Sequence, residues 1–346
     1  MFEHMKAAVY KDVGKVEIKD VPEPKISPNE VLLHVKACAI CGTDVRIFHY
    51  GHPKVTPPRI LGHEVAGEVA MIGKDVKELS VGERVTVDPL IPCGKCYYCL
   101  QGIHNLCDDA KAIAYDFDGG FAEYLVIPEG AISSGCVVKL PEGLSYDEAT
   151  VAEPLGCCIN GQERAGVKLG ETVAIMGVGP IGCLHLKLAK AKGAKVIIIE
   201  YNEARLKKAM ELGADIAINP KNEDPIKRVL EETGGKGADV LIVACSSSVA
   251  QQQSPQMTAK RGKIIFFGGL PHEEPIINLN SNIVHYKEQD IMGSFSLTPY
   301  QFRKAVNLIA SGIIDVKNII TDTFPLENIV DALKRAEEGL KIIIKI

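Results

Sequence analysis

The chain has 346 residues, 46% of them hydrophobic and 24% charged, a composition that excludes disordered and fibrous classes and suits about two globular domains. Lysine plus arginine (39) against aspartate plus glutamate (44) gives a net charge of −5. That charge argues against nucleic acid or an anionic membrane as the main partner and favours a small molecule. No run approaches the ~18 apolar residues of a membrane span, and residues 1–10 lack the apolar core of a signal peptide, so we expect no membrane contact and a cytoplasmic location.

Up to about Pro141, short β-rich runs such as 30–36 and 82–88 alternate with glycine and proline turns, which predicts an irregular β domain. From Gly170 onward strands and helices alternate, the rhythm of an α/β doubly wound parallel sheet. The predicted elements are Thr172–Met176, Pro180–Lys192, Lys195–Glu200, Glu203–Leu212, Asp239–Cys245 and Lys263–Phe267. A helix at Pro299–Ser311 and a short β tail follow, and we expect them to pack back onto the first domain.

A glycine-rich turn, Gly177-Val178-Gly179-Pro180-Ile181-Gly182, directly follows a predicted strand and opens a predicted helix. Glycines at this spacing let a dinucleotide pyrophosphate approach the backbone at a helix N-terminus. The acidic residue expected ~20 positions later is Glu200, which would bind the ribose hydroxyls and repel a 2′-phosphate. The pattern predicts NAD rather than NADP, although Arg205 lies close enough in sequence to weaken that repulsion.

Four of the eleven cysteines lie close together: Cys93, Cys96, Cys99 and Cys107. Four thiolates at this spacing suit a closed tetrahedral zinc site, which is structural because no position is left for substrate. Six of the other seven lie in apolar runs and are interpreted as small core residues without chemistry: Cys38, Cys136, Cys157, Cys158, Cys183 and Cys245.

A third group of candidate residues is dispersed along the chain. The stretch Cys41-Gly-Thr43-Asp44, the stretch Gly62-His63-Glu64 and the later Glu153 offer one thiol, one imidazole and carboxylates. Such a set would make a catalytic zinc site with room for substrate if the fold brought it together. The spacing alone leaves open whether these are metal ligands or ordinary structural residues.

Taken together, these motifs resemble the zinc-dependent medium-chain alcohol dehydrogenase family, and most closely its polyol (sorbitol) and threonine dehydrogenase branch. Further matching segments are Asp118-Gly-Gly-Phe-Ala-Glu-Tyr124 and Leu212-Gly-Ala-Asp215. The resemblance implies a GroES-like zinc-binding catalytic domain at 1–152, a Rossmann NAD-binding domain at 153–293, and a segment at 294–346 that returns to the catalytic domain. It also implies an active site in the cleft between the two domains and a homodimer or homotetramer.

The resemblance also implies roles for individual residues. Cys41 and His63 would bind the catalytic zinc. The carboxylate ligand stays open, because Glu64 binds the metal in the polyol branch and the residue at the Glu153 position does so in other branches. Thr43 would take the substrate proton. Further cofactor contacts would come from Ile181, Glu200, Arg205, Gly268, Gly269, Leu270, Ser294 and Phe295.

Two residues depart from the family pattern. Arg46 stands where the proton relay usually ends on a histidine, and a guanidinium cannot act as a base. Its charge is expected to pair with Asp44 or a cofactor phosphate, or alternatively to select an anionic substrate with help from Lys54 or Arg59. Ser296 stands where sorbitol dehydrogenases carry an arginine, which argues against sorbitol itself.

The predicted function is therefore zinc-dependent transfer of a hydride between a secondary alcohol (polyol, sugar or sugar derivative) and NAD, with two zinc ions per chain. Zinc would lower the pKa of the substrate hydroxyl, and Thr43 would pass the proton toward solvent. One alternative is an L-threonine 3-dehydrogenase-like or 2,3-diol dehydrogenase activity. A more distant one is a non-catalytic zinc- and nucleotide-binding protein, which the complete catalytic set argues against.

Overall fold

The computed structural model describes residues 4–271 and 273–346. Its contacts divide the chain into two compact units. The first unit comprises the residues up to Gly156 together with Ser296–Ile346, and the second comprises Cys157–Phe295. The boundaries expected from the sequence, 152/153 and 293/294, lie a few residues earlier. None of the described helices is long and apolar enough to cross a membrane.

The first unit is built around a seven-stranded mixed sheet in which the order β10-β6-β5-β3-β18-β17 is extended by β9 on β3. The strands of the whole unit are β1 (His4–Asp12), β2 (Lys15–Pro22), β3 (Val31–Ala39), β4 (Arg59–Ile60), β5 (Glu64–Ile72), β6 (Arg84–Val87), β7 (Leu90–Ile91), β8 (Lys111–Ala112), β9 (Tyr124–Ile127), β10 (Val137–Lys139), β17 (Ile320–Pro325) and β18 (Lys341–Lys345). Strands β2-β1-β4 and β7-β8 form two smaller sheets.

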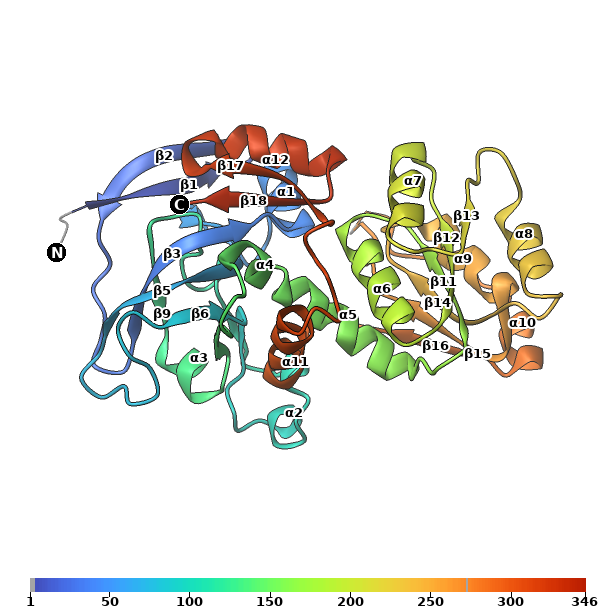
Figure 1. Cartoon of the computed structure of the whole chain (residues 1–346), viewed down its shortest axis with the longest axis horizontal. Coiled ribbons are helices and arrows are strands. Elements are labelled where there is room, and N and C mark those ends of the chain that lie inside the picture. Colours follow the sequence, from blue (N-terminus) through green and yellow to red (C-terminus); the bar gives the residue numbers. More distant parts are fainter. Residues whose placement is uncertain (1–3, 272) are drawn as a thin grey trace. The chain divides into compact units, whose positions relative to one another are not determined.

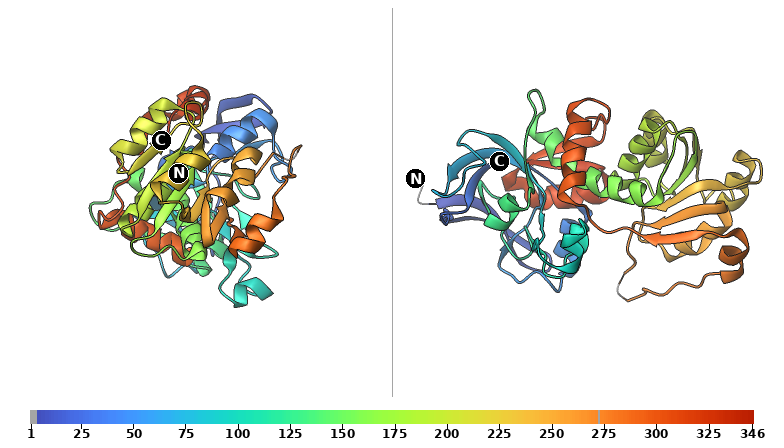
Figure 2. Two further views of the ribbon diagram at one scale, coloured as in Figure 1. Left: turned by 90° about the vertical axis from the view of Figure 1, so that its right-hand side faces the viewer. Right: turned by 90° about the horizontal axis from the view of Figure 1, so that it is seen from below.

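The helices of the first unit are short. They are α1 (Gly42–Tyr50), α2 (Tyr97–Leu100), α3 (Glu129–Ser133), α4 (Tyr146–Thr150), α11 (Pro299–Ala310) and α12 (Ile329–Glu338), with 3₁₀ turns at His104–Leu106 and Leu326–Asn328. Helix α5 (Ala152–Ala165) begins in this unit and continues into the second. The C-terminal tail lies in this unit, where β18 pairs antiparallel with β3. Figures 1 and 2 show the blue N-terminal and red C-terminal strands in the same unit.

The second unit is a six-stranded, wholly parallel sheet in the order β13-β12-β11-β14-β15-β16. Its strands are β11 (Thr172–Met176), β12 (Lys195–Ile199), β13 (Ile216–Ile218), β14 (Ala238–Val243), β15 (Thr258–Phe266) and β16 (Asp290–Gly293). Its helices are α6 (Pro180–Ala191), α7 (Glu203–Glu211), α8 (Pro225–Glu232), α9 (Ser248–Met257) and α10 (Ser281–Lys287). Helices α6 and α7 pack on β11–β13, while α9 and α10 pack on β14 and β15 (Figure 1).

This strand order is that of a doubly wound dinucleotide fold. The direction of winding reverses between β11 and β14, and ligands of such sheets bind at the carboxyl ends of the strands beside the reversal. The turn 177–182 follows β11 at this point. The central strands consist almost entirely of buried aliphatic residues, as expected for a parallel sheet covered on both faces.

Candidate active site and metal centres

The four-cysteine loop forms a compact cluster in the first unit. The sulfur atoms of Cys93, Cys96, Cys99 and Cys107 all lie within 4.8 Å of one another. The backbone N–H of Cys93 donates to Sγ of Cys107 at 3.2 Å, and that of Cys96 donates to Sγ of Cys93 at 3.4 Å. Backbone N–H donors, chiefly that of Cys99, lower the pKa of the Cys96 thiol to about 6. Four converging sulfurs, one held readily as thiolate, fit a closed structural zinc.

A second cluster joins residues far apart in sequence. Cys41 lies two residues beyond β3, and His63 immediately precedes β5. The two strands pair antiparallel with Ala39 opposite Glu64, and this register brings the two segments together. One ligand atom from each of Cys41, His63 and Glu64 lies within 4.8 Å of the others. Sulfur, nitrogen and oxygen donors in a mostly buried position fit a zinc ion with one place left for substrate.

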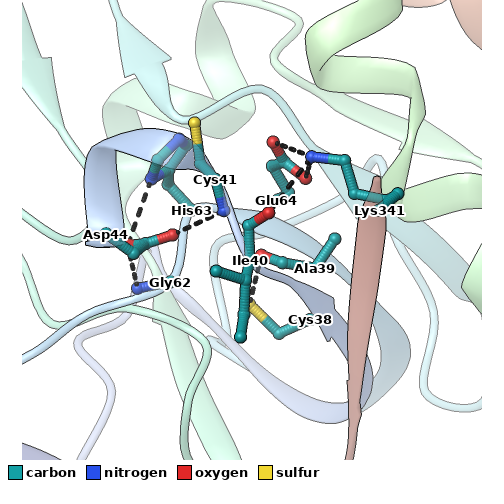
Figure 3. A network of polar contacts seen from close by, with 9 residues as sticks. All are labelled: Cys38, Ala39, Ile40, Cys41, Asp44, Gly62, His63, Glu64 and Lys341. Carbon is teal, nitrogen blue, oxygen red and sulfur yellow. Dashed lines mark hydrogen bonds and ion pairs between the residues drawn. The ribbon is translucent and has the colours of Figure 1, made fainter. Parts of the chain in front are cut away.

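Asp44 organises one side of this cluster (Figure 3). Its buried carboxylate accepts hydrogen bonds from the backbone N–H groups of Cys41 at 2.9 Å and Gly62 at 3.2 Å. Its Oδ1 lies 3.7 Å from Nδ1 of His63. Burial alone would lower the pKa of His63, but the charges of Asp44 and Cys41 raise it well above the usual value. Asp44 therefore contacts both segments that carry the candidate ligands, and its negative charge attracts the imidazole ring of His63.

The two candidate carboxylates differ in position. Glu64 is fully buried and belongs to the cluster, whereas Glu153, in the first turn of α5, is half-buried and is not one of its three members. The negative charge of Glu153 nevertheless acts on both His63 and Lys341, so it lies near the site. Thr43 is half-buried in the first turn of α1.

The glycine turn of the second unit has the geometry that the motif demands. Gly177 has φ +90°, and a side chain on Gly182 would collide with the carbonyl of Gly177. The Glu200 carboxylate accepts hydrogen bonds from the backbone N–H of Val178 at 2.9 Å and from those of Tyr201 and Asn202 at 2.8 and 3.0 Å. Glu200 thus stands directly beside the turn at the end of β12.

The other predicted cofactor residues lie in the same unit, near the carboxyl ends of its strands. Pro180 opens α6, Arg205 lies in the first turn of α7, and Gly268-Gly-Leu270 follows β15. A side chain on Gly268 would collide with the carbonyl of Cys245, which shows how closely the backbones approach there. Ser294 and Phe295 follow β16, and Phe295 is 65% exposed.

Comparison with known proteins matches these two units to known domains. The model of the alcohol dehydrogenase GroES-like domain matches residues 27–142, and that of zinc-binding dehydrogenase matches residues 180–311. Sorbitol dehydrogenase of Bacillus subtilis strain 168 is 35% identical, over 99% of this chain and 97% of its own. The chain belongs to the zinc-dependent medium-chain alcohol dehydrogenase family.

Two further relatives place this dehydrogenase within the family. L-threonine 3-dehydrogenase of Bacillus licheniformis is 37% identical over 92% of this chain and 91% of its own. A crystal structure described as a zinc-binding dehydrogenase from Sinorhizobium meliloti, bound to NADP, has a TM-score of 0.92 at 32% identity and covers 99% of both chains. The predicted fold class, the polyol/threonine branch and the reaction class, zinc-dependent oxidation and reduction of small-molecule alcohols, are confirmed.

The expected pairing of Arg46 with Asp44 in this dehydrogenase is wrong. Asp44 is fully buried and its oxygens face Cys41, Gly62 and His63, whereas the Arg46 side chain is exposed. The helix places the two residues on different faces, because positions two apart do not share a face. Lys54 is also exposed, and Arg59 pairs with Asp118 at 3.2 Å.

The interpretation of the six other cysteines as core residues holds for four of them. Cys38, Cys136, Cys158 and Cys183 are buried. Cys157 and Cys245 are only half-buried, because Cys157 lies on a less covered face of α5 and Cys245 follows the end of β14. For these two cysteines, the prediction of burial from their apolar sequence neighbours was too strong.

Tyr115 is a residue beside the site that the sequence analysis did not identify. Its pKa is raised first by burial and then by the charges of Asp44 and Cys41, and the charge of Arg46 also acts on it. Its ring meets that of His52 edge to face, with centroids 5.1 Å apart. The preceding Ala114 is held at φ 71°, a left-handed conformation that is strained for alanine. A tyrosine in a short loop carries no motif, so only the fold reveals its position.

Proposed function

We propose that this dehydrogenase oxidises a secondary alcohol of a polyol, sugar or sugar derivative, with NAD as hydride acceptor. The buried convergence of Cys41, His63 and Glu64 carries the proposal, because three protein ligands leave one position of a tetrahedral zinc for the substrate hydroxyl. Zinc bound there would lower the pKa of that hydroxyl. The four-cysteine cluster would hold the second zinc of the chain.

The residues around the cluster supply the remaining steps of the proposed reaction. Thr43, one residue before Asp44 in the first turn of α1, would accept the substrate proton and pass it toward solvent. Membership of the close cluster supports Glu64 as the carboxylate ligand. Glu153 would then act from outside the ligand set, where its charge adds to that of Asp44 at His63.

NAD is proposed over NADP because of Glu200. Glu200 directly follows β12, and its carboxylate lies beside the glycine turn, where it would accept hydrogen bonds from the adenosine ribose and repel a 2′-phosphate. Arg205, in the first turn of the next helix, is the residue that would reduce this preference.

A second candidate function is oxidation of the 3-hydroxyl of L-threonine. The similarity to L-threonine 3-dehydrogenase of Bacillus licheniformis supports it. Ser296, in place of the arginine of sorbitol dehydrogenases, weakens the case for sorbitol itself but not for other polyols. Oxidation of a 2,3-diol is a variant of the leading proposal, and the cytoplasmic location and the homodimer or homotetramer stay predictions.

One experiment separates these candidates. Purified protein with its zinc content measured would be assayed for reduction of NAD and of NADP with sorbitol, xylitol, 2,3-butanediol, sugar phosphates and L-threonine. The leading proposal expects kcat/KM to be highest for a polyhydroxylated secondary alcohol with NAD. A preference for threonine would support the second candidate. Absence of turnover with every alcohol, in protein holding two zinc ions, would contradict both.

A further inference from the structure

The C-terminal strand β18 places a buried cation beside the cluster of Cys41, His63 and Glu64. Lys341 is the first residue of β18 and is only 2% exposed. Its Nζ donates to the two carboxylate oxygens of Glu64 at 2.8 and 2.7 Å and to the carbonyl of Ile40 at 3.2 Å. All three of its donor protons can therefore be satisfied inside the protein.

These contacts join the two segments that carry the ligands. Ile40 precedes Cys41, and Glu64 follows His63, so one ammonium group spans both. Asp44 does the same from the other side through the N–H groups of Cys41 and Gly62. Figure 3 shows Cys41 and His63 between Asp44 on the left and Glu64 with Lys341 on the right.

A buried ion pair of this kind is weak evidence for stability, because desolvation of both charges offsets much of their attraction. Other lysines in the described part of the chain, such as Lys139 and Lys227, make their ion pairs at the surface instead. Lys345, in the same strand, pairs with Asp147 and is 49% exposed. Stability alone therefore does not explain why Lys341 is buried here. Its contacts with both segments that carry the candidate ligands point to a role at the metal site.

We propose that Lys341 is a positioning residue of the catalytic metal site, which orients the Glu64 carboxylate toward Cys41 and His63. The inference rests on the proposed role of Glu64 as a zinc ligand. Lys341 fixes the direction of the carboxylate and balances its charge, so that Glu64 can present a lone pair to the metal while both oxygens stay hydrogen-bonded. Outer partners of this kind typically contribute 10–100-fold to metal affinity.

The test compares Lys341→Met, which removes the charge at similar length, with Lys341→Arg and with the matched control Lys345→Met. Zinc per chain is measured by elemental analysis after dialysis against increasing chelator, and the visible spectrum is recorded with cobalt in the exchangeable site. In Lys341→Met, the affinity of the catalytic site for zinc should be roughly 10–100-fold lower, so that this zinc ion is lost at a lower chelator concentration. The cobalt spectrum of the same site should also change. Lys345→Met should match the wild type, and Lys341→Arg should recover part of the loss.

A double variant keeps the inference testable if Lys341→Met does not fold, because Lys341→Met combined with Glu64→Gln leaves no unpaired buried charge. If Lys341 acts through Glu64, the double variant should bind zinc as the single Glu64→Gln variant does. Unchanged zinc affinity and cobalt spectrum in Lys341→Met, with only a lower Tm, would show a merely structural ion pair. A full additional loss in the double variant would also overturn the inference.

These readouts are separate from the assay of the proposed function. A wild type that oxidises no alcohol, but whose zinc affinity responds to Lys341 as described, would refute the proposed function alone. An active wild type with unaltered metal binding in Lys341→Met would refute only the inference.

Discussion

The carboxylate of Asp44 accepts a hydrogen bond from the backbone N–H of Cys41 at 2.9 Å. The same side chain binds the N–H of Gly62, so its removal would leave two backbone donors unpaired near the metal site. Each buried group left unpaired costs about 1–3 kcal/mol. We predict that Asp44→Ala lowers Tm and weakens binding of the catalytic zinc, measured by calorimetry and metal analysis.

The exposed Asp331 of α12 offers a control for this prediction, because Asp331→Ala removes an aspartate without touching the site. Normal zinc affinity and Tm in Asp44→Ala would show that water or backbone rearrangement replaces the Asp44 contacts.

Cys96→Ser should remove the structural zinc. Three remaining thiols hold zinc poorly, and metal binding by such a loop is coupled to its folding. We expect zinc per chain to fall from two to one and Tm to decrease, while the catalytic zinc stays. Cys157→Ser removes a thiol outside both clusters and should keep two zinc ions. Retention of both metals by Cys96→Ser would refute the assignment.

Acid should release the structural zinc by protonating the thiolates that bind it. In the zinc-free loop the pKa of Cys96 is lowered to about 6, so its thiolate is present above that pH and is protonated below it. Burial raises the pKa of Cys99 to about 12 and that of Cys107 above its usual value, so protons compete with zinc for these sulfurs throughout the neutral range. Zinc affinity of this cluster should therefore fall as pH decreases, and fall more steeply below about 6, where Cys96 is also protonated. Zinc release from the wild-type protein, measured as a function of pH, should show this loss of affinity. A zinc affinity that does not change with pH down to pH 5 would contradict the prediction.

Glu200 should control cofactor preference. Glu200→Gln removes the charge but keeps one acceptor oxygen, whereas Glu200→Ala also removes the partner of three backbone N–H groups. A lost charged hydrogen bond is worth about 1.5–3 kcal/mol. We predict that Glu200→Gln lowers the ratio of kcat/KM for NAD to that for NADP by about 10–100-fold, and that Glu200→Ala also lowers Tm. A wild type faster with NADP would refute the prediction.

Tyr115 should contribute to substrate selection. Burial raises its pKa, so the phenol stays protonated at neutral pH and can donate a hydrogen bond to a second hydroxyl of the substrate. We predict that Tyr115→Phe raises KM severalfold for 2,3-butanediol and polyols, in the range of about 0.5–1.5 kcal/mol, and changes 2-butanol little. Equal effects on mono-alcohols and diols would mean that only the ring of Tyr115 matters.

Arg46 should favour anionic substrates, because its guanidinium is exposed and lies close enough to Tyr115, beside the site, for its charge to act on that phenol. We predict that Arg46→Gln raises KM for a sugar phosphate more than for the matching neutral sugar alcohol, and that high salt reduces this difference. Equal KM changes for both substrates, or none, would leave Arg46 without a part in recognition.

The sequence alone was sufficient for features that depend on local chain geometry. The spacing of Cys93, Cys96, Cys99 and Cys107 allows the loop to wrap one metal whatever the rest of the chain does. The glycine turn at 177–182 is likewise specified by its own backbone, since Gly177 needs a positive φ and Gly182 a close approach. The strand–helix alternation predicted the second unit because each element carries its own hydrophobic period.

Tertiary structure decided what depends on contacts between distant segments. The register of β3 on β5 brings Cys41 to His63 and places Glu64, rather than Glu153, in the close cluster. The return of the tail as β18 adds Lys341, 277 positions away from its partner Glu64. No local period encodes such a pairing, because a buried charge is stabilised only by the partner that the complete fold supplies.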